Sequence, residues 1–322
     1  MSNQAPWLGR EMESPSMRGP LSGLIPACHT PLGPDGSLNL SMVESQARFL
    51  HQSGIESVFV GGTTGEFASL SLKERMALVE RWCESLGGAL KVAVHVGHNC
   101  LPEAVALASH ARKAGAMAIA VMAPSYFKPV TVDDLIDFCV PIAAEAEPLP
   151  FYFYDIPEMT GVRFRMSELL YQARFRIPTL RGLKYSNHDF LELQECIRLD
   201  GGAFDVLLGV DECLLAGLCL GIRGAVGSTF NFAAPVYRRL IHHFDDQDLT
   251  SARLEQGKSI DLIKVLSTFG FLAASKCVMA MLGVDCGPVR PPVRNLTLQE
   301  RQTLWERLSP LDVFPAPLRR PE

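Results

Sequence analysis

The sequence predicts an α/β protein built as a (β/α)8 barrel, or TIM barrel, with a C-terminal helical extension. From about residue 22 to about residue 235, eight short apolar segments alternate with longer segments of helical periodicity. Most of the short segments are apolar on both faces, as parallel strands are when helices cover the sheet. No Gly-rich phosphate-binding turn follows the first segment, which disfavours a doubly wound open sheet.

The eight predicted strands share short runs of β-branched, aromatic or small apolar residues. They are Gly23–Cys28, Ser57–Gly61, Lys91–Gly97, Met117–Ala123, Pro150–Asp155, Thr179–Tyr185, Phe204–Gly209 and Gly224–Ser228. Helix start signals lie between them. Ser71 with Glu74 and Thr131 with Asp134 have the spacing of capping boxes, in which each side chain satisfies a backbone N–H at the helix start. Pro102 suits the first turn of a third helix.

Beyond residue 235 the strand signal ends and helical patterns replace it. We expect helices over residues 249–268 and 269–282, and a last one that begins at the capping box Thr297–Glu300. The predicted organisation therefore has four parts. These are a mobile leader at 1–20, a barrel at 21–235, a helical extension at 236–314 and a frayed tail at 315–322.

Composition and charge exclude several classes of protein. The 322 residues are 48% hydrophobic and 20% charged, which is enough for a large globular core. The net charge is −5 and Lys/Arg runs are absent, so no nucleic-acid partner is expected. The apolar stretches, such as 117–124, are far shorter than the ~18 residues of a membrane span. Nine scattered cysteines without a Cys-x-x-Cys pair are typical of reduced thiols, which predicts a cytoplasmic protein.

Reactive groups of a (β/α)8 barrel lie where its strands end and in the loops that follow. In this sequence those positions collect a lysine, two tyrosines, several hydroxyls and, after the seventh predicted strand, two carboxylates. They are the segment Gly61-Gly-Thr-Thr-Gly-Glu66, Tyr126, Tyr154, Lys184, Asp211, Glu212, Ser228 and Thr229. The sequence therefore predicts an active site at this end of the barrel.

Lys184 is the most informative of these residues. A buried lysine loses its proton more readily than a solvated one, and its neutral amine attacks carbonyl groups. The alternative is a snorkelling lysine or a structural ion pair. Tyr154 by itself is better explained as a core aromatic, but beside an iminium-forming lysine its phenol can shuttle protons. The pair therefore favours catalysis.

The remaining candidates have weaker signals. Thr63 and Thr64 lie in a Gly-rich turn that suits a small carboxylate, although such a turn can also satisfy only its own backbone. The turn lacks the Gly-Lys-Ser/Thr of a Walker loop. His95 and His98 have no recognisable third metal ligand, so we interpret them as core or loop histidines.

Four motifs in order resemble those of the pyruvate-dependent class I aldolases, the family of dihydrodipicolinate synthase and N-acetylneuraminate lyase. They are Gly61–Glu66, Tyr154-Asp-Ile-Pro157 with Thr160-Gly-Val162, Gly182-Leu-Lys184 and Gly227-Ser-Thr-Phe-Asn231. The resemblance runs from about Leu21 to Thr297. Segments 156–162, 208–212 and 224–231 are similar to the lyase branch in particular. The synthases typically have an arginine two residues after the motif proline, where this chain has Met159.

The resemblance implies a role for each matching residue. Lys184 would form a Schiff base with the C2 carbonyl of the substrate, and Tyr154 would relay a proton to or from the C4 hydroxyl. Thr63 and Thr64 would hold the pyruvyl carboxylate, and Thr64 would also orient Tyr154. The residues implied for the rest of the substrate are Ser186, Gly209 through its backbone, Asp211, Glu212 and Ser228. No metal or organic cofactor is implied, and the implied partner is another copy of the chain in a homotetramer.

The implied reaction is reversible cleavage of N-acetylneuraminate to pyruvate and N-acetylmannosamine. One alternative is an aldolase or dehydratase that acts on another 2-keto-3-deoxy sugar acid. It stays open because Asp155 and Glu158 depart from the lyase pattern and add negative charge near the site. A third hypothesis is a barrel that binds a sugar acid without converting it. The combination of Lys184 and Tyr154 argues against that, because a binding protein needs neither an amine nor a phenol there.

Overall fold

The computed structural model describes residues 21–322 and contains one sheet of eight parallel strands. The strands are β1 (Gly23–Pro26), β2 (Ser57–Val60), β3 (Lys91–His95), β4 (Ala118–Met122), β5 (Phe151–Asp155), β6 (Leu180–Tyr185), β7 (Asp205–Leu208) and β8 (Gly224–Gly227). Their order in the sheet is β1-β8-β7-β6-β5-β4-β3-β2, and a parallel bridge between Ala27 and Phe59 joins the β1 and β2 edges. All eight predicted strands are confirmed, each one or two residues shorter than expected.

Two apolar layers explain why these strands close into a barrel. The larger layer lies between the sheet and the surrounding helices. The smaller one fills the barrel interior, where alanines on β3 and β4 leave room for bulky rings from neighbouring strands. These rings are those of Phe59, Tyr152 and Tyr154. Tyr154, a residue of the predicted site, is therefore also part of the packing inside the barrel.

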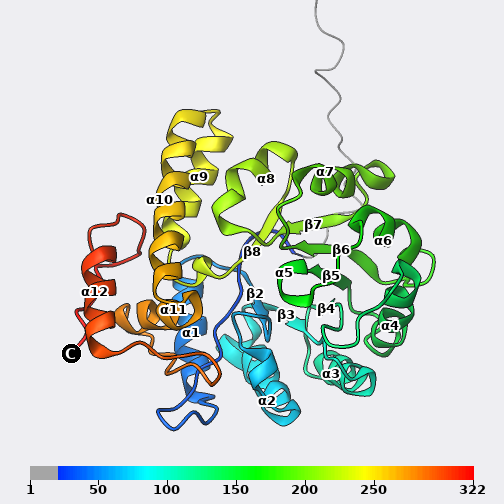
Figure 1. Cartoon of the computed structure of the whole chain (residues 1–322), viewed down its shortest axis with the longest axis horizontal. Helices are drawn as coiled ribbons and strands as arrows, with labels where there is room; N and C mark the ends of the chain where they lie inside the picture. Colours follow the sequence, from blue (N-terminus) through cyan, green and yellow to red (C-terminus); the bar gives the residue numbers. More distant parts are fainter. Residues whose placement is uncertain (1–20) are drawn as a thin grey trace, which may run out of the picture.

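Helices alternate with the strands and surround them (Figure 1). They are α1 (Ser41–Gln52), α2 (Leu72–Glu84), α3 (Leu101–Lys113), α4 (Val132–Glu145), the short α5 (Pro157–Thr160), α6 (Met166–Ala173), α7 (Phe190–Arg198) and α8 (Leu214–Leu220). The predicted capping boxes are present at the starts of α2 and α4. Pro102 lies in the first turn of α3, as predicted.

The helix after β8 is α9 (Ala234–Asp245), and it completes the alternation of strands and helices. The predicted barrel boundary at residue 235 therefore falls inside the first turn of the eighth barrel helix. The extension proper consists of α10 (Leu249–Thr268), α11 (Phe271–Met281) and α12 (Leu298–Leu308), whose capping box begins at Thr297 as expected. In Figure 1, α10 lies beside α9, and α11 and α12 pack against α10.

The expected mobile leader lies outside the described residues, whereas the tail 315–322 is described and differs from the prediction. The Trp305 indole N–H donates to the Leu318 carbonyl over 3.0 Å, and the Arg319 N–H donates to the Met281 carbonyl over 2.9 Å. Leu318 is buried. The tail therefore packs on α11 and α12, which its Pro- and Arg-rich composition did not indicate.

Within residues 21–322, no single helix has the length and apolar composition needed to cross a membrane. Only α10 and α11 meet that test when they are joined, and the two are bent by 112° at their junction. All nine cysteines lie in this part of the chain and all are free.

Candidate active site

Strands β5 and β6 bring the lysine and the first tyrosine of the predicted site together. Tyr154 and Lys184 are direct partners in the register of the two strands. The Lys184 Nζ atom lies 3.9 Å from the centroid of the Tyr154 ring and 4.1 Å from that of Phe59. Only 4% of Lys184 is exposed. The amine is therefore enclosed by two aromatic rings at the carboxyl end of the barrel.

Burial shifts Lys184 toward its neutral form. Burial lowers the pKa of Lys184 below the usual lysine value, while the Tyr154 hydroxyl and the more distant Asp211 carboxylate partly oppose that shift. Within residues 21–322, no carboxylate lies within 4 Å of the amine. A structural ion pair therefore does not account for this buried lysine. Burial without a paired charge makes this lysine a better nucleophile than a solvated one.

The turn after β2 supplies two hydroxyls to the same end of the barrel. Thr63 Oγ1 lies within hydrogen-bond distance of the Tyr154 hydroxyl, at 3.2 Å. Thr64 Oγ1 lies 2.6 Å from Ser228 Oγ, which follows β8. The threonine in contact with the Tyr154 hydroxyl is therefore Thr63, whereas the resemblance implies Thr64. A turn with two positive-φ residues, Gly61 and Glu66, can present both side chains in this way.

His95, at the end of β3, contacts both this turn and Tyr154. Its Nδ1 lies 2.9 Å from the Gly61 carbonyl oxygen, and its ring packs edge-on against Tyr154 with 5.9 Å between centroids. Burial and the Arg75 guanidinium hold the pKa of His95 well below its usual range, so the ring is neutral and Nδ1–H donates to Gly61. The core assignment is confirmed. The contact with Tyr154 was missed, although the strand-end position of His95 was a signal.

Asp211 is anchored to the start of the turn after β8. Its Oδ2 accepts hydrogen bonds from the Thr229 N–H over 2.8 Å and from the Thr229 hydroxyl over 2.5 Å. Burial raises the pKa of Asp211, and the two bonds from Thr229 partly oppose this. One carboxylate oxygen is therefore already engaged. The predicted contact of Asp211 with the substrate would use the other oxygen.

Ser186 and Gly209 lie side by side where β6 and β7 end. The Gly209 N–H donates to the Tyr185 carbonyl over 2.8 Å, and a Cβ at position 209 would lie 2.0 Å from Ser186 Oγ. Glu212 is half-buried in the turn Asp211–Cys213. The structure thus joins Lys184, Tyr154 and Thr63 by contacts, Thr64 to Ser228, and Ser186 to Gly209. The contact of Glu212 with the substrate stays a prediction.

The two carboxylates that depart from the lyase pattern occupy different surroundings. Glu158 is exposed on α5 and forms an ion pair with Arg163 at 2.9 Å, which offsets its charge. Asp155 is buried at the end of β5, where the Asn187 amide donates to its Oδ2 over 3.1 Å. Burial raises the pKa of Asp155 to about 6. Tyr126, by contrast, lies outside this cluster with 78% of its surface exposed.

The raised pKa of Asp155 predicts a pH-dependent effect of Asp155→Asn on stability. The folded chain keeps the Asp155 proton up to about pH 6, whereas the unfolded chain releases it near pH 4. The wild type therefore loses stability as pH rises through this window, and the asparagine variant does not. We expect the stability of the variant relative to wild type to rise by up to about 3 kcal/mol between pH 4 and pH 7.5.

Urea unfolding of both proteins at the two pH values measures this difference. Asp261→Asn, at an exposed position on α10, is the control and should give the same difference at both pH values. A relative stability of Asp155→Asn that does not change with pH would show that Asp155 ionises normally in the folded protein.

The fold and this site together define a lysine-dependent aldolase barrel, in which a buried amine, a phenol and a hydroxyl-lined turn meet at the carboxyl ends of the strands. The chain belongs to the dihydrodipicolinate synthetase family, whose model matches residues 20–310.

Three of the relatives bear the same name. N-acetylneuraminate lyase of Gallus gallus is 42% identical over 281 residues, which cover 86% of this chain and 91% of that protein. The Sus scrofa protein of the same name is 38% identical, with coverage of 94% and 96%. The solved structure of Proteus mirabilis N-acetylneuraminate lyase superposes with a TM-score of 0.89 at 38% identity, with coverage of 91% and 99%.

Proposed function

We propose that this protein is a Schiff-base-forming lyase that cleaves N-acetylneuraminate reversibly into pyruvate and N-acetylmannosamine. The observation that carries the proposal is the buried Lys184 amine, without a carboxylate within 4 Å and in contact with Tyr154, which in turn contacts Thr63. Relatives at about 40% identity over most of the chain bear the name of this lyase, which supports the choice of substrate.

The proposed reaction begins when the Lys184 amine attacks the C2 carbonyl of the sugar acid. Loss of water forms a protonated imine that withdraws electrons from the neighbouring carbon. Tyr154 relays the proton of the C4 hydroxyl, accepting it while its own phenolic proton passes to water, and the C3–C4 bond breaks. The electron pair of that bond passes into the imine to form an enamine. N-acetylmannosamine leaves as the aldehyde. Protonation of the enamine at C3 and hydrolysis by water then release pyruvate and restore the free amine.

The turn and the strand ends supply the contacts that hold the substrate in this scheme. Thr63 and Thr64, with the backbone of their turn, bind the pyruvyl carboxylate. The polyhydroxy tail lies against Ser186, Gly209, Asp211, Glu212 and Ser228. A carboxylate can accept several O–H donors, and loss of one such bond costs about 1–3 kcal/mol. These residues therefore set which sugar acid fits.

The second candidate function is the same chemistry on a different 2-keto-3-deoxy sugar acid. The departure of Asp155 from the lyase pattern favours it, because this buried carboxyl contacts Asn187, which adjoins Ser186 of the predicted site. The exposed Glu158 is a weaker argument, since Arg163 offsets its charge.

Borohydride trapping tests both candidates. The protein is incubated with pyruvate or with N-acetylneuraminate, reduced with borohydride, and its intact mass is measured. We expect a reduced pyruvyl adduct from both compounds. An adduct from pyruvate but not from N-acetylneuraminate would keep the Schiff base and assign a different sugar acid. No adduct from either compound would contradict catalysis by Lys184 and favour the non-catalytic binding protein.

We further propose that the protein is a cytoplasmic homotetramer. The support is the family resemblance, together with an apolar stretch exposed in the loop after β4 that a second copy of the chain could cover. Its members are Tyr126, Phe127 and Val130. Sedimentation equilibrium of the full chain tests the assembly, and a monomer at micromolar concentration would contradict it.

A further inference from the structure

The turn that carries Thr63 and Thr64 ends at a buried ion pair with the C-terminal extension. Glu66, the last residue of the Gly61–Glu66 turn, places Oε1 2.6 Å from the Nζ atom of Lys276 on α11. Both side chains are only 2% exposed. The two residues are 210 positions apart in the sequence, so the contact ties the barrel mouth to the extension.

Each partner of this pair also binds the loop 282–297 that follows α11. The second Glu66 oxygen accepts a hydrogen bond from the Arg290 backbone N–H over 2.9 Å. The Lys276 ammonium donates to the Pro288 carbonyl over 2.8 Å. The hydrogen bonds meet the need of both buried charges for polar partners, without which burial would be costly. The geometry is thus specific to one carboxylate and one ammonium.

The same turn is held at other points by neutral groups. His95 binds the Gly61 carbonyl at its start, and the Thr30 hydroxyl donates to the Gly65 carbonyl over 2.6 Å. Glu66 itself has a φ of +54°, which lies in the left-handed region. Residues other than glycine are uncommon in this region, and the contacts around them usually stabilise it. The ion pair is the charged contact that holds the turn in this conformation.

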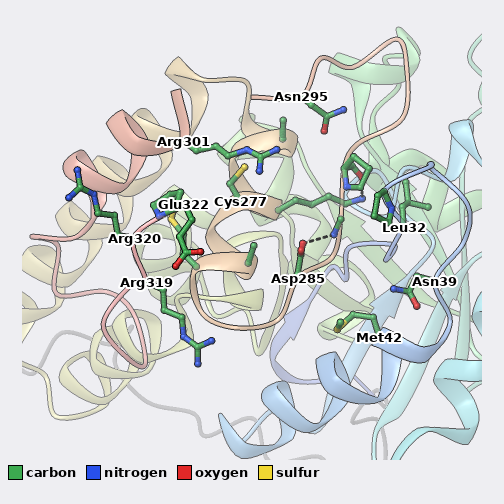
Figure 2. Close-up of a pocket in the computed structure, with 18 residues that line it drawn as sticks. Leu32, Asn39, Met42, Cys277, Asp285, Asn295, Arg301, Arg319, Arg320 and Glu322 are labelled. Carbon is green, nitrogen blue, oxygen red and sulfur yellow. Dashed lines mark hydrogen bonds between the residues drawn. The ribbon is translucent and has the colours of Figure 1, made fainter. Parts of the chain in front are cut away.

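The pair does not line the proposed reaction site. Lys276 instead borders a separate cavity of about 710 Å³ on the extension side, whose other lining residues include Asp285, Arg301 and Arg319. Figure 2 shows these three side chains around the hollow between α1 and the extension. Any effect of the ion pair on the reaction must therefore pass through the turn.

We propose that Glu66 and Lys276 are positioning residues that hold Thr63 and Thr64 in place for the substrate carboxylate. The inference rests on the proposed function, because it assigns the carboxylate to this turn. Displacement of binding groups by about 1 Å can reduce catalytic efficiency about 100-fold. Loss of the pair therefore weakens capture of the keto acid while the Lys184 amine stays intact.

The test is the double variant E66Q/K276M, which removes both charges and leaves neither buried alone. The matched control is E255Q/K258M, which removes the Glu255–Lys258 ion pair on α10 together with the contacts of these two residues with Arg239 and Asp312. None of these residues is bonded to the turn. For each folded protein, borohydride trapping is measured over a range of pyruvate concentrations. We expect the half-saturating concentration to rise at least about tenfold in E66Q/K276M, with full adduct at saturation, and to stay within twofold of wild type in the control.

A purely structural role would lower the melting temperature without moving the half-saturating concentration, and that result would overturn the inference. An equal rise in the control variant would also overturn it. If E66Q/K276M does not fold, E66Q/K276Q replaces it, because this variant keeps a neutral hydrogen-bonding pair. An unchanged half-saturating pyruvate concentration in E66Q/K276Q would also overturn the inference. Absence of adduct in the wild type overturns the proposed function and this inference together, whereas trapping in the wild type with no shift in the variants overturns only the inference.

Discussion

Lys184→Ala is expected to abolish the reaction, with a loss of at least about 10⁴-fold in kcat/KM, equivalent to about 5 kcal/mol of transition-state stabilisation. The reason is that the methyl group of alanine cannot form an imine, while the aromatic wall of Phe59 and Tyr154 remains. The measurements are pyruvate release from N-acetylneuraminate and intact mass after borohydride reduction. The variant should show neither turnover nor adduct.

Lys91→Ala is the matched control for this experiment. Lys91 begins β3 at the opposite end of the barrel strands and is exposed, so it is expected to keep both turnover and adduct. Folding of each variant is checked by circular dichroism. An adduct of unchanged yield on folded Lys184→Ala would place the Schiff base on another amine and remove the basis of the proposed mechanism.

Tyr154→Phe is expected to lower kcat by about 10²- to 10⁴-fold, the range typical of the loss of a general acid–base group. The change removes the hydroxyl near Thr63 but keeps the ring that packs against Lys184, Phe59 and His95. The Tyr154 hydroxyl raises the pKa of Lys184 against the effect of burial, so its loss leaves the amine more often neutral. The adduct with pyruvate should therefore still form.

Steady-state kinetics and pyruvate trapping of Tyr154→Phe separate these two effects. Tyr171→Phe, on the exposed side of α6, is the control and should behave like the wild type. A kcat within a few-fold of wild type would mean that another group relays the proton from the C4 hydroxyl. Loss of the adduct as well as turnover would instead assign Tyr154 to imine formation.

One segment at the barrel mouth adds support to the preference for a lyase over a synthase. Met159 is exposed on α5 at the position where the synthases typically have an arginine, and the nearby Arg163 pairs with Glu158. α5 therefore offers no positively charged side chain that could bind a second carboxylate on the substrate. This agrees with relatives that bear the lyase name.

The amino-acid sequence alone determined the barrel and the reactive pair. Eight apolar segments and three capping boxes are local signals, because strand burial and helix starts depend on neighbouring residues. Once two consecutive parallel strands are recognised, Tyr154 and Lys184 must lie at adjoining strand ends, and the structure places them as register partners. Because reactive groups of a (β/α)8 barrel lie where its strands end, the sequence then predicts the site.

Tertiary structure decided what holds these groups in place. It pairs Tyr154 with Thr63 rather than Thr64 and engages one oxygen of Asp211 with Thr229. It also extends the barrel past residue 235 and packs the tail against α11 and α12. The buried pair of Glu66 and Lys276 has no sequence signal at all. Such contacts join residues that are far apart in the chain. These residues come within bonding distance only after the barrel and its extension have packed together, so no local sequence pattern predicts them.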